Sequence, residues 1–599
     1  MKFKILCLVL CLCLLAGCTP AVTPSTYPEQ EWNDSDISQE QLFTELFNIN
    51  NKISLRLDMS DEALAKMQID YEQYSQHGSK SPIYREATLY VTITTEENIT
   101  YSYKIEEVGV RMKGNTSRTA FYDEKEGIYN IIHLKLSFQE TFDDPVYYGE
   151  YAKQWEETAR KARKNRTFAT LEKIDLRWNR CDDGTYLKEY FAYETYRQYG
   201  VLAPHTNLCS FDWAGIHMGV FTINEPVDKH FLEKNLPQEA LGGDLYKVGW
   251  AGGNNGSFTS LNSIGIENED TGEFYAFDLK TNKKTSTHAS LTTLITKMNG
   301  QMTKEHFAQL VDLDNFLPFC AVSYLLGNPD DMRNNYNNFY LYFRADNGKA
   351  VFIPYDYDRC LGVTAHWNPT GDGVTSDNPF STTLNADGTH QRNPLILHSV
   401  AAGGFYVTEY AAILRQIADG EWFTLANFSY IYQIAANHYT NTARPGKQFY
   451  NTEGLHLSFD LERTSDFSSQ GNISIREYLE AKQRTLRFYL QNMDQFLDVK
   501  PVVPSQWYIR SEVTNWQTDP NYAMTQEDGL FVIRIQVSRS LRLKVYNEES
   551  GRWYGAECVA ENCTVPFDSD GHTNIVLQDG IYRILFDPVT ETIFLEKED

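Results

Sequence analysis

The chain has 599 residues, of which 80 are acidic and 54 are basic, so its formal net charge is −26. A surface of this charge repels nucleic acid and anionic lipid, which argues against both as partners but leaves room for a local basic pocket that binds a nucleotide. With 42% hydrophobic residues the chain can fill large cores, and its length predicts two or more domains.

The N-terminus predicts export. Lys2 and Lys4 precede an apolar run that ends in L-A-G-C. The run is too short for an ordinary membrane span and has the layout of a secretory signal. It resembles the leader of bacterial lipoproteins, which implies cleavage of residues 1–17, lipidation of Cys18 and anchoring to the outer face of a bacterial membrane. Residues 18–38 are rich in Thr, Pro, Ser and acids and predict a flexible tether.

Alternating apolar residues predict a mainly β first part, and apolar residues at helical spacing predict a helix-rich second part. Strands are expected at 52–58, 85–93, 99–112, 131–138, 171–178, 206–212 and 217–224, and helices at 39–50, 61–74, 183–199, 290–298 and 303–326. A β-hairpin is expected within 328–362, followed by a long polar loop and further helical segments to about residue 492.

The spacing of the cysteines indicates little about function. Six cysteines follow Cys18 and form no C-x-x-C pair, so a zinc site is not expected. Cys558 and Cys563 are close enough in sequence to bridge a hairpin in an oxidising compartment.

Two acidic clusters flank the expected hairpin. Asp330 and Asp331 precede it, Asp356 and Asp358 follow it, and Asn335 lies five residues after Asp330. An acid, an amide five residues later and a second acid beyond a hairpin is the arrangement by which protein kinases hold Mg²⁺ and orient the attacking hydroxyl. The alternative is a polar loop, since Asp and Asn are common in turns. Acids that follow a buried strand such as V-F-I-P need a partner, which favours the site.

Further blocks surround these clusters in a definite order. They are G-V-R-M-K-G-N-T-S-R, I-D-L-R-W-N with Y-L-K-E-Y-F-A-Y-E-T-Y-R-Q-Y-G-V-L-A-P, G-V-F-T-I-N-E-P-V-D, and N-N-F-Y-L-Y with V-F-I-P-Y-D-Y-D-R-C-L-G. Together they resemble the spore-coat-protein-H (CotH) kinase family over residues 50–491. The resemblance implies an α+β, atypical protein-kinase-like domain at 39–500 with a nucleotide between its two parts. It also implies binding of ATP and Mg²⁺ and phosphorylation of Ser or Thr in a protein substrate or in the chain itself.

The resemblance assigns a phosphate-binding loop. The residues that match the family's R-x-(K/R)-G-N-x-S loop are Arg111, Lys113, Gly114, Asn115 and Ser117. A turn of small residues lets backbone N–H groups approach phosphate, and the two cations supply charge. The alternative is a polar hairpin.

The resemblance also assigns residues on the elements that follow. Lys135, in the middle of L-K-L, is similar to the lysine that pairs with the nucleotide phosphates, although a lysine in an alternating strand usually faces solvent. Glu189 is a candidate ion-pair partner for Lys135, and Glu194 on the same helix is its rival. Glu225 matches an acid that the family often carries, with no role that the residues reveal.

In the acidic clusters, Asp330 is expected to orient the substrate hydroxyl because of its spacing to Asn335, and Asp331 is its close rival. Asn335 and Asp356 are expected to hold Mg²⁺. Asp358 is either a second metal ligand or a structural acid.

The C-terminal part, residues 505–599, changes character after a Pro-rich linker. Short strands separated by turn residues predict a small all-β sandwich domain. Its aromatic strands resemble the β-sandwich modules of bacterial proteins that handle starch. The resemblance implies a glycan platform built from Trp507, Trp516, Trp553 and Tyr554, although at least one of these tryptophans is expected in the core.

Three functions compete. The first is a surface-anchored CotH-like protein kinase, against which stands the scarcity of ATP outside the membrane. The second is an adhesion or glycan-binding lipoprotein that keeps the kinase-like core as a scaffold. The third and weakest is a glycosidase that uses two of the carboxylates.

Overall fold

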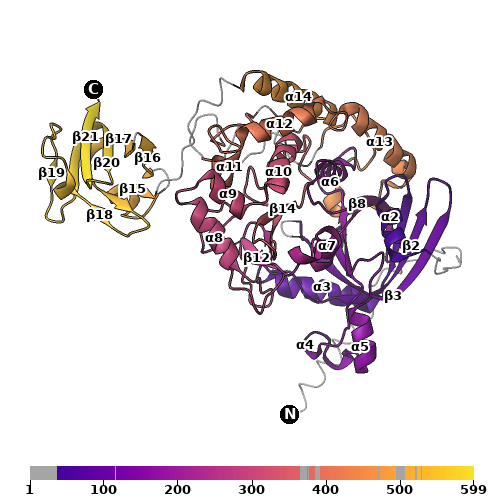
Figure 1. The fold of residues 1–599 in the computed structure, drawn as a ribbon. Coiled ribbons are helices and arrows are strands. Elements are labelled where there is room, and N and C mark those ends of the chain that lie inside the picture. The colour runs from indigo at the N-terminus through magenta and orange to yellow at the C-terminus, as the bar shows by residue number, and fades with distance from the viewer. Residues whose placement is uncertain are drawn as a thin grey trace, which may run out of the picture.

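The computed structural model describes residues 37–114, 117–251, 253–364, 374–375, 377–384, 391–465, 467, 472–493, 506–519, 522–527 and 529–598. The expected leader, Cys18, nearly all of the tether and Asn115 lie outside these residues. The described part of the chain forms a strand-rich N-terminal region, a helix-rich region around a second sheet, and a C-terminal sheet that stands apart in Figure 1.

The N-terminal region is a closed barrel whose strands follow the order β1-β2-β3-β6-β7-β9-β8. Its strands are β1 (Lys52–Asp58), β2 (Arg85–Thr94), β3 (Thr100–Lys113), β6 (His133–Ser137), β7 (Lys173–Trp178), β8 (Thr206–Trp213) and β9 (Ile216–Asn224). β1 and β8 close the barrel in parallel, and the other neighbours are antiparallel. Leu55, Leu89, Leu134 and Leu176 alternate with polar residues and fill the barrel core, so the period-two pattern sets which face of each strand is buried.

Short elements surround the barrel. They are α2 (Gln39–Phe47), α3 (Asp61–Ser75), β4 (Tyr122–Asp123), β5 (Ile128–Tyr129), α4 (Pro145–Tyr148), α5 (Glu157–Lys164), α6 (Lys188–Gln198) and α7 (Lys229–Asn235). α4 and α5 project from one end of the barrel in Figure 1. α6 begins later than the predicted residue 183, because the Asp183 carboxylate accepts the N–H groups of Thr185 and Lys188 and holds a turn there.

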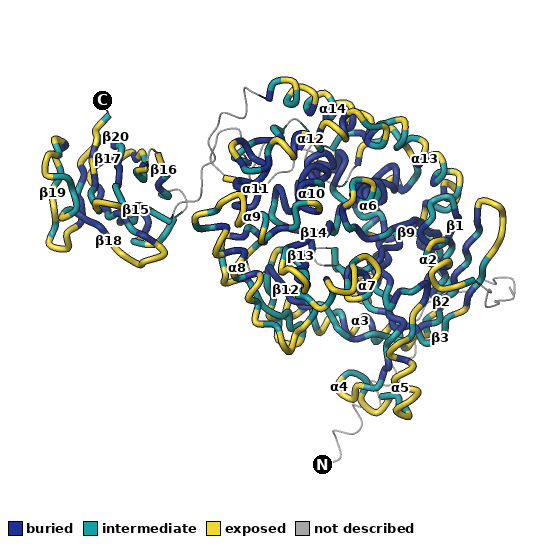
Figure 2. The backbone as a smooth tube through the Cα atoms, in the orientation of Figure 1, coloured by how far each residue is buried: buried dark blue, intermediate teal, exposed yellow. Residues whose placement is uncertain are grey.

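The second sheet has the order β11-β12-β10-β13-β14. Its strands are β10 (Leu245–Val248), β11 (Ile264–Gly265), β12 (Phe277–Leu279), β13 (Phe339–Phe343) and β14 (Ala350–Pro354). β13 and β14 form the predicted hairpin, and every one of their residues is buried. Helix α10 (Leu313–Leu326) contacts β14 and is dark blue along most of its length in Figure 2. Strands covered on both faces read as continuous apolar runs, which explains F-Y-L-Y-F and A-V-F-I-P.

The remaining helices pack around this sheet in one hydrophobic core. They are α8 (Ala289–Met298), α9 (Lys304–Leu310), α11 (Pro394–Ser399), α12 (Val407–Asp419), α13 (Leu425–Tyr439) and α14 (Ile475–Gln491). The helix predicted at 303–326 is two helices, α9 and α10, because Val311 between them bridges to Ala350 of β14. Among the described residues, no helix is long and apolar enough to cross a membrane.

The C-terminal region is a sheet with its own core. Its strands are β15 (Trp507–Ser511), β16 (Thr525–Glu527), β17 (Leu530–Asn547), β18 (Trp553–Tyr554), β19 (Asp568–Ser569), β20 (Ile575–Asp587) and β21 (Thr592–Glu598). All of these strands belong to one hydrogen-bonded sheet built around β17 and β20, so a two-layer sandwich stays a prediction. Cys558 and Cys563 are free thiols. The presence of both helices and sheets confirms the α+β class.

Candidate functional site

A cavity of about 760 Å³ lies between the barrel and the second sheet. Many of the side chains predicted from the sequence line it, although they come from distant parts of the chain. These residues are Arg111, Lys113, Gly114, Ser117, Lys135, Asp330, Asn335, Asp356 and Asp358. The barrel supplies one side of the cavity, and the connections around the β13–β14 hairpin supply the other.

The barrel side is a two-row array of polar residues on three neighbouring strands, here called the barrel wall. It consists of Arg111 and Lys113 on β3, His133 and Lys135 on β6, and Asp175 and Arg177 on β7. In the sheet register Arg111 stands opposite Lys135, Lys113 opposite His133, and Lys135 opposite Asp175. Because the residues between them point into the barrel core, sheet hydrogen bonding alone fixes these side chains on the cavity face.

Asp175 is the negative centre of the barrel wall. Its carboxylate lies 2.6 Å from Lys113 Nζ and 3.3 Å from Lys135 Nζ. Burial disfavours its ionised form, but the two lysines outweigh this and hold the pKa of Asp175 well below its usual range. Burial lowers the pKa of Lys135, against the pull of Asp175. Lys135 therefore pairs with its cross-strand neighbour and not with the expected Glu189.

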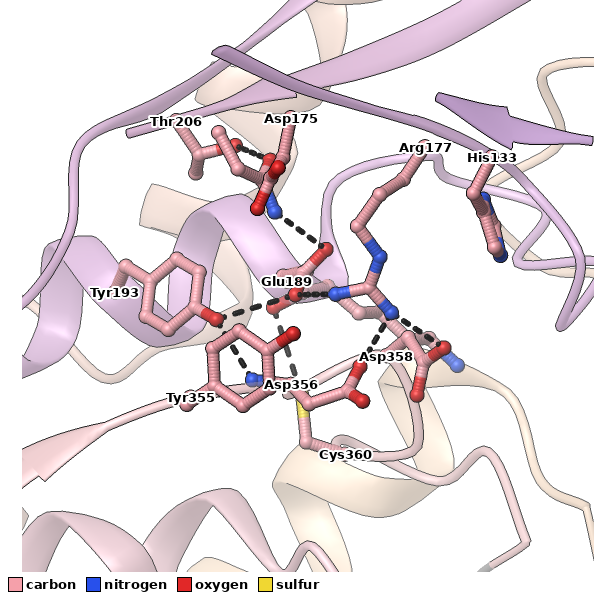
Figure 3. A network of polar contacts seen from close by, with 12 residues as sticks. His133, Asp175, Arg177, Glu189, Tyr193, Thr206, Tyr355, Asp356, Asp358 and Cys360 are labelled. Carbon is pink, nitrogen blue, oxygen red and sulfur yellow. Dashed lines mark hydrogen bonds and ion pairs between the residues drawn. The ribbon is translucent and has the colours of Figure 1, made fainter. Parts of the chain in front are cut away.

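Glu189 belongs to a second network, centred on Arg177 (Figure 3). Arg177 Nη1 donates to Glu189 Oε1 at 2.6 Å, while Nη2 contacts Asp356 Oδ1 and, at 2.9 Å, Asp358 Oδ2. Burial works against the guanidinium charge, but the three carboxylates raise the pKa of Arg177 far above its usual value. The rival Glu194 pairs with Arg197 on its own helix. Arg177 thus ties the barrel to α6 and to the residues after β14.

The other side of the cavity, here called the hairpin wall, consists of Asp330, Asn335, Asp356 and Asp358. Asp330 Oδ1 accepts hydrogen bonds from the amide groups of Asn335 at 2.8 Å and Asn337 at 2.9 Å. Burial raises the pKa of Asp330, and the two amides offset this only in part. The carboxylate is thus fixed in place and more basic than an ordinary aspartate.

Asp331, the rival of Asp330, does not line the cavity. It is fully buried and accepts hydrogen bonds from Ser323 Oγ at 2.5 Å and from the backbone N–H groups of Arg333 and Asn334. Burial raises its pKa to about 6. These contacts hold the turn after α10, so of the two candidates only Asp330 can meet a substrate in the cavity.

Asp356 and Asp358 stand side by side after β14. Asp356 has a left-handed backbone, with φ of +60°, and its N–H donates to the Tyr193 hydroxyl at 2.9 Å. Burial opposes its ionisation, but Arg177 and nearby lysines keep the pKa of Asp356 below its usual value. Burial, followed by the charge of Asp356, raises the pKa of Asp358 to about 6. The left-handed backbone of Asp356 is uncommon for a non-glycine residue, and such residues are found more often at functional sites.

The donor atoms of the hairpin wall fit Mg²⁺. Among the described residues, no group of three or more His, Cys, Asp or Glu could hold a metal ion by itself. Magnesium needs only one or two carboxylates and takes its other oxygens from water and phosphate. Because the amide nitrogen of Asn335 donates to Asp330, its carbonyl oxygen is the atom left for a metal. Asp356 and Asp358 each contact Arg177 through one oxygen, which leaves the second oxygen of each available to a cation.

Several cavity residues were not predicted. Asp175 and Arg177 alternate with apolar residues in I-D-L-R-W as Lys135 does in L-K-L, and this signal could have found them. His133, two residues before Lys135 in H-L-K-L, follows the same alternation, whereas Lys247 carried no recognisable pattern. Glu225 is a prediction that the cavity does not include, since it is buried and pairs with His205 at 2.8 Å and Lys234 at 3.0 Å.

The four aromatic residues predicted as a glycan platform do not share one surface. Trp507 and Tyr554 pack on Phe586 in the core, with ring centroids 4.5 and 4.7 Å away. Trp553 is 40% exposed and lies near Trp516 and Tyr546. Trp553 and Tyr554 are neighbours on β18, so their side chains point to opposite faces.

The comparison with protein families adds an independent finding. The model of the family described as CotH kinase protein matches residues 110–438, a range that includes every residue of the barrel wall and the hairpin wall. No curated protein matches the chain. Since the match covers more than half of the sequence, this protein belongs to the CotH kinase protein family.

Proposed function

We propose that the protein is an atypical kinase that transfers the γ-phosphoryl group of ATP to a Ser or Thr hydroxyl, with Mg²⁺ bound at the hairpin wall. One observation carries the proposal: a single cavity joins a cation-rich wall to an acid-bearing wall. Among the described residues that line it, nine are Lys or Arg and seven are Asp or Glu, in a chain of net charge −26. A local excess of cations in an acidic protein suits a polyphosphate ligand.

The barrel wall would bind the phosphates. Arg111, Lys113 and Lys135 lie on adjacent strands at fixed sheet positions, so their charges need no rearrangement to meet an anion. Arg111 is held by Ser81, whose backbone oxygen accepts from Nη1 at 2.8 Å. Asp175 would keep both lysines in place while the cavity is empty of phosphate.

Asp330 would orient the acceptor hydroxyl. The amides of Asn335 and Asn337 fix its carboxylate, and its raised pKa makes it a better proton acceptor than a solvated aspartate. Mg²⁺, when bound by Asn335, Asp356 and Asp358, would neutralise charge on the transferred phosphoryl group. The acceptor would be another protein or the chain itself, at the outer membrane face where the lipoprotein leader would place it.

The test is thermal unfolding of residues 19–599 with and without Mg·ATP, together with transfer of labelled γ-phosphate. Ligand at one hundred times its dissociation constant stabilises the native state by about 2.7 kcal/mol. Asp356→Ala is expected to abolish both the Mg-dependent shift and phosphate transfer while the protein stays folded. Asp346→Ala is the matched control, because Asp346 lies in the turn of the same hairpin and pairs only locally with Arg344. A wild-type protein that shows no shift at millimolar Mg·ATP would exclude the proposed activity.

A second candidate function, glycan binding, is favoured by an aromatic cluster of the C-terminal region in which Trp553 is exposed and Trp516 and Tyr546 are half-buried. Trp516, Tyr546 and Trp553 lie together, and the Arg510 guanidinium stacks on Tyr546 at 3.5 Å. An exposed aromatic ring beside a polar donor suits stacking on a sugar. Trp553→Ala should abolish retention on immobilised starch, whereas Phe594→Ala, which removes an exposed ring on β21, should not.

A further inference from the structure

His133 is the one residue of the barrel wall that is neither a carboxylic acid nor a lysine or arginine. It belongs neither to the phosphate-binding loop nor to the acidic clusters, so its role is still open. It is the first residue of β6, is 4% exposed and lines the cavity. In the sheet register it stands opposite Lys113 of β3, and Arg177 of β7 lies beside it in Figure 3. A buried imidazole ring among the cations of the barrel wall needs a physical explanation.

The backbone determines which nitrogen of the ring carries the proton. The Trp178 N–H donates to His133 Nδ1 at 3.1 Å, so Nδ1 must be the acceptor and the proton of a neutral ring must sit on Nε2. Burial, followed by the charges of Arg177 and Lys113, lowers the pKa of His133 well below its usual value. The ring therefore stays neutral at physiological pH and offers one N–H donor.

We propose that His133 binds a phosphate oxygen of the nucleoside triphosphate as a neutral hydrogen-bond donor through Nε2–H. This inference rests on the proposed kinase function and deepens it. Of the neighbouring cations, Arg177 is engaged with Glu189, Asp356 and Asp358, and Lys113 shares its charge with Asp175. A donor held in place by Trp178 adds a directed contact without a further buried charge.

The same hydrogen bond excludes two other roles for His133. Since Nδ1 is occupied by the Trp178 N–H and Nε2 bears the proton, the ring has no lone pair with which to deprotonate a hydroxyl. It is also an unsuitable ligand for Mg²⁺, which prefers oxygen. What this tautomer can offer to the cavity is a hydrogen bond to an acceptor oxygen, and phosphate supplies such oxygens.

Two isosteric variants separate the two nitrogens. In His133→Gln the amide nitrogen replaces Nε2 as a donor to the cavity, and in His133→Asn the short side chain replaces only Nδ1. We expect His133→Gln to keep the dissociation constant for Mg·ATP within about threefold of wild type, and His133→Asn to weaken it about tenfold or more. The constant is obtained from nucleotide titrations monitored by thermal unfolding of residues 19–599, and unfolding without nucleotide reports structural damage separately.

A second measurement reports the tautomer without any activity. Nitrogen NMR of ¹⁵N-histidine-labelled protein, with His133→Gln used to assign the signal, should show an Nε2-protonated ring between pH 6 and 8. The charged groups that face the ring are Lys113 of β3, Arg177 of β7, Arg180 after β7 and Asp356 after β14. Mg·ATP should shift the Nε2 resonance. An imidazolium or an Nδ1–H ring would overturn the inference.

The outcomes distinguish the two proposals. If wild-type protein binds Mg·ATP and His133→Asn binds it equally well, the role of His133 is wrong while the proposed function stands. If wild-type protein does not bind Mg·ATP at all, both are wrong. If His133→Gln fails to bind although it unfolds at the wild-type temperature, a hydrogen-bond donor at Nε2 is not what the site requires.

Discussion

The two walls of the cavity are built in different ways. On the barrel wall every side chain comes from a strand, and its neighbours are dictated by sheet register. On the hairpin wall the side chains come from connections with left-handed backbones at Tyr336, Asn338 and Asp356, whose φ angles are +56°, +55° and +60°. The first wall gains its precision from regular hydrogen bonding, and the second stores strain that surrounding side-chain contacts must hold.

The walls also differ in the electrostatic environment of their acids. Asp175 on the barrel wall lies between two lysines that outweigh its burial and keep it ionised. Asp330 and Asp358 on the hairpin wall have pKa values raised by burial. The acid of the barrel wall is thus compensated before any ligand arrives, whereas Asp330 and Asp358 of the hairpin wall would gain from a cation. Arg177 is the residue that joins the two walls.

Removal of Arg177 should lower the stability of the protein most, because its guanidinium joins the two walls. Arg177→Leu leaves Glu189, Asp356 and Asp358 buried without their shared cation, and breaking a buried ion pair from one side is destabilising by about 3–5 kcal/mol. The measurement is the free energy of unfolding in urea. Arg552→Leu, which removes an exposed pair with Glu591, is the control and should change it by less than about 1 kcal/mol. Equal effects would mean that Arg177 does not join the walls.

A smaller effect on stability, which depends on pH, is expected from Asp331, the buried acid behind the hairpin wall. The folded pKa of Asp331, about 6, exceeds the ordinary value of about 3.9, so the native state binds more protons than the unfolded state between these values. Stability from this group is therefore lost as pH rises from about 4 to 6. The difference in unfolding free energy between wild type and Asp331→Asn should fall by up to about 1.4 kcal/mol per pH unit there.

Asp175→Asn is the matched control for this pH series. Burial and the two lysines act on Asp175 in opposite directions, and the lysines win, so its contribution changes only at lower pH. A difference for Asp331→Asn that is independent of pH would show that hydrogen bonds, and not burial, dominate this acid.

The smallest effect on stability is expected in the turn of the β13–β14 hairpin. Gly348 has φ of +72°, and a Cβ added there meets nothing within 4 Å, so Gly348→Ala would cost only the left-handed backbone, about 1–2 kcal/mol. Gly300→Ala, at a glycine outside the left-handed region, is the control. Denaturant midpoints measure both. If the two variants unfold alike, backbone conformation in the hairpin is not limiting and the contrast between the walls loses part of its basis.

The difference between the walls also explains what the sequence could predict. Alternation located the strands of the barrel, because a period of two decides the side of a strand, and the family resemblance assigned Lys135 to the nucleotide. Alternation could not predict that Lys135 faces Asp175, since strand pairing joins residues forty positions apart. The acids of the hairpin wall were found through kinase-like spacing, but only their three-dimensional placement separates Asp330 from the buried Asp331.

The C-terminal region shows the same limit. Aromatic composition predicted a platform of Trp507, Trp516, Trp553 and Tyr554, but composition does not state on which face each ring lies. Strand alternation within β18 would have shown that Trp553 and Tyr554 cannot share a surface. The burial of Trp507 depends on its packing against Phe531 and Phe586 from other strands, which no local pattern reveals.

The parallel closure of the barrel has a consequence for how the chain acquires its structure. β1 has β2 as one neighbour and β8 as the other, and Ser54 lies beside Ser210 in the second pairing. If the barrel forms from its N-terminal end, its first strand is therefore among the last of the barrel to gain both partners. Contacts of such sequence separation slow folding, and an unpaired strand edge invites association with other chains. Until β8 joins β1, the barrel stays open along one strand edge.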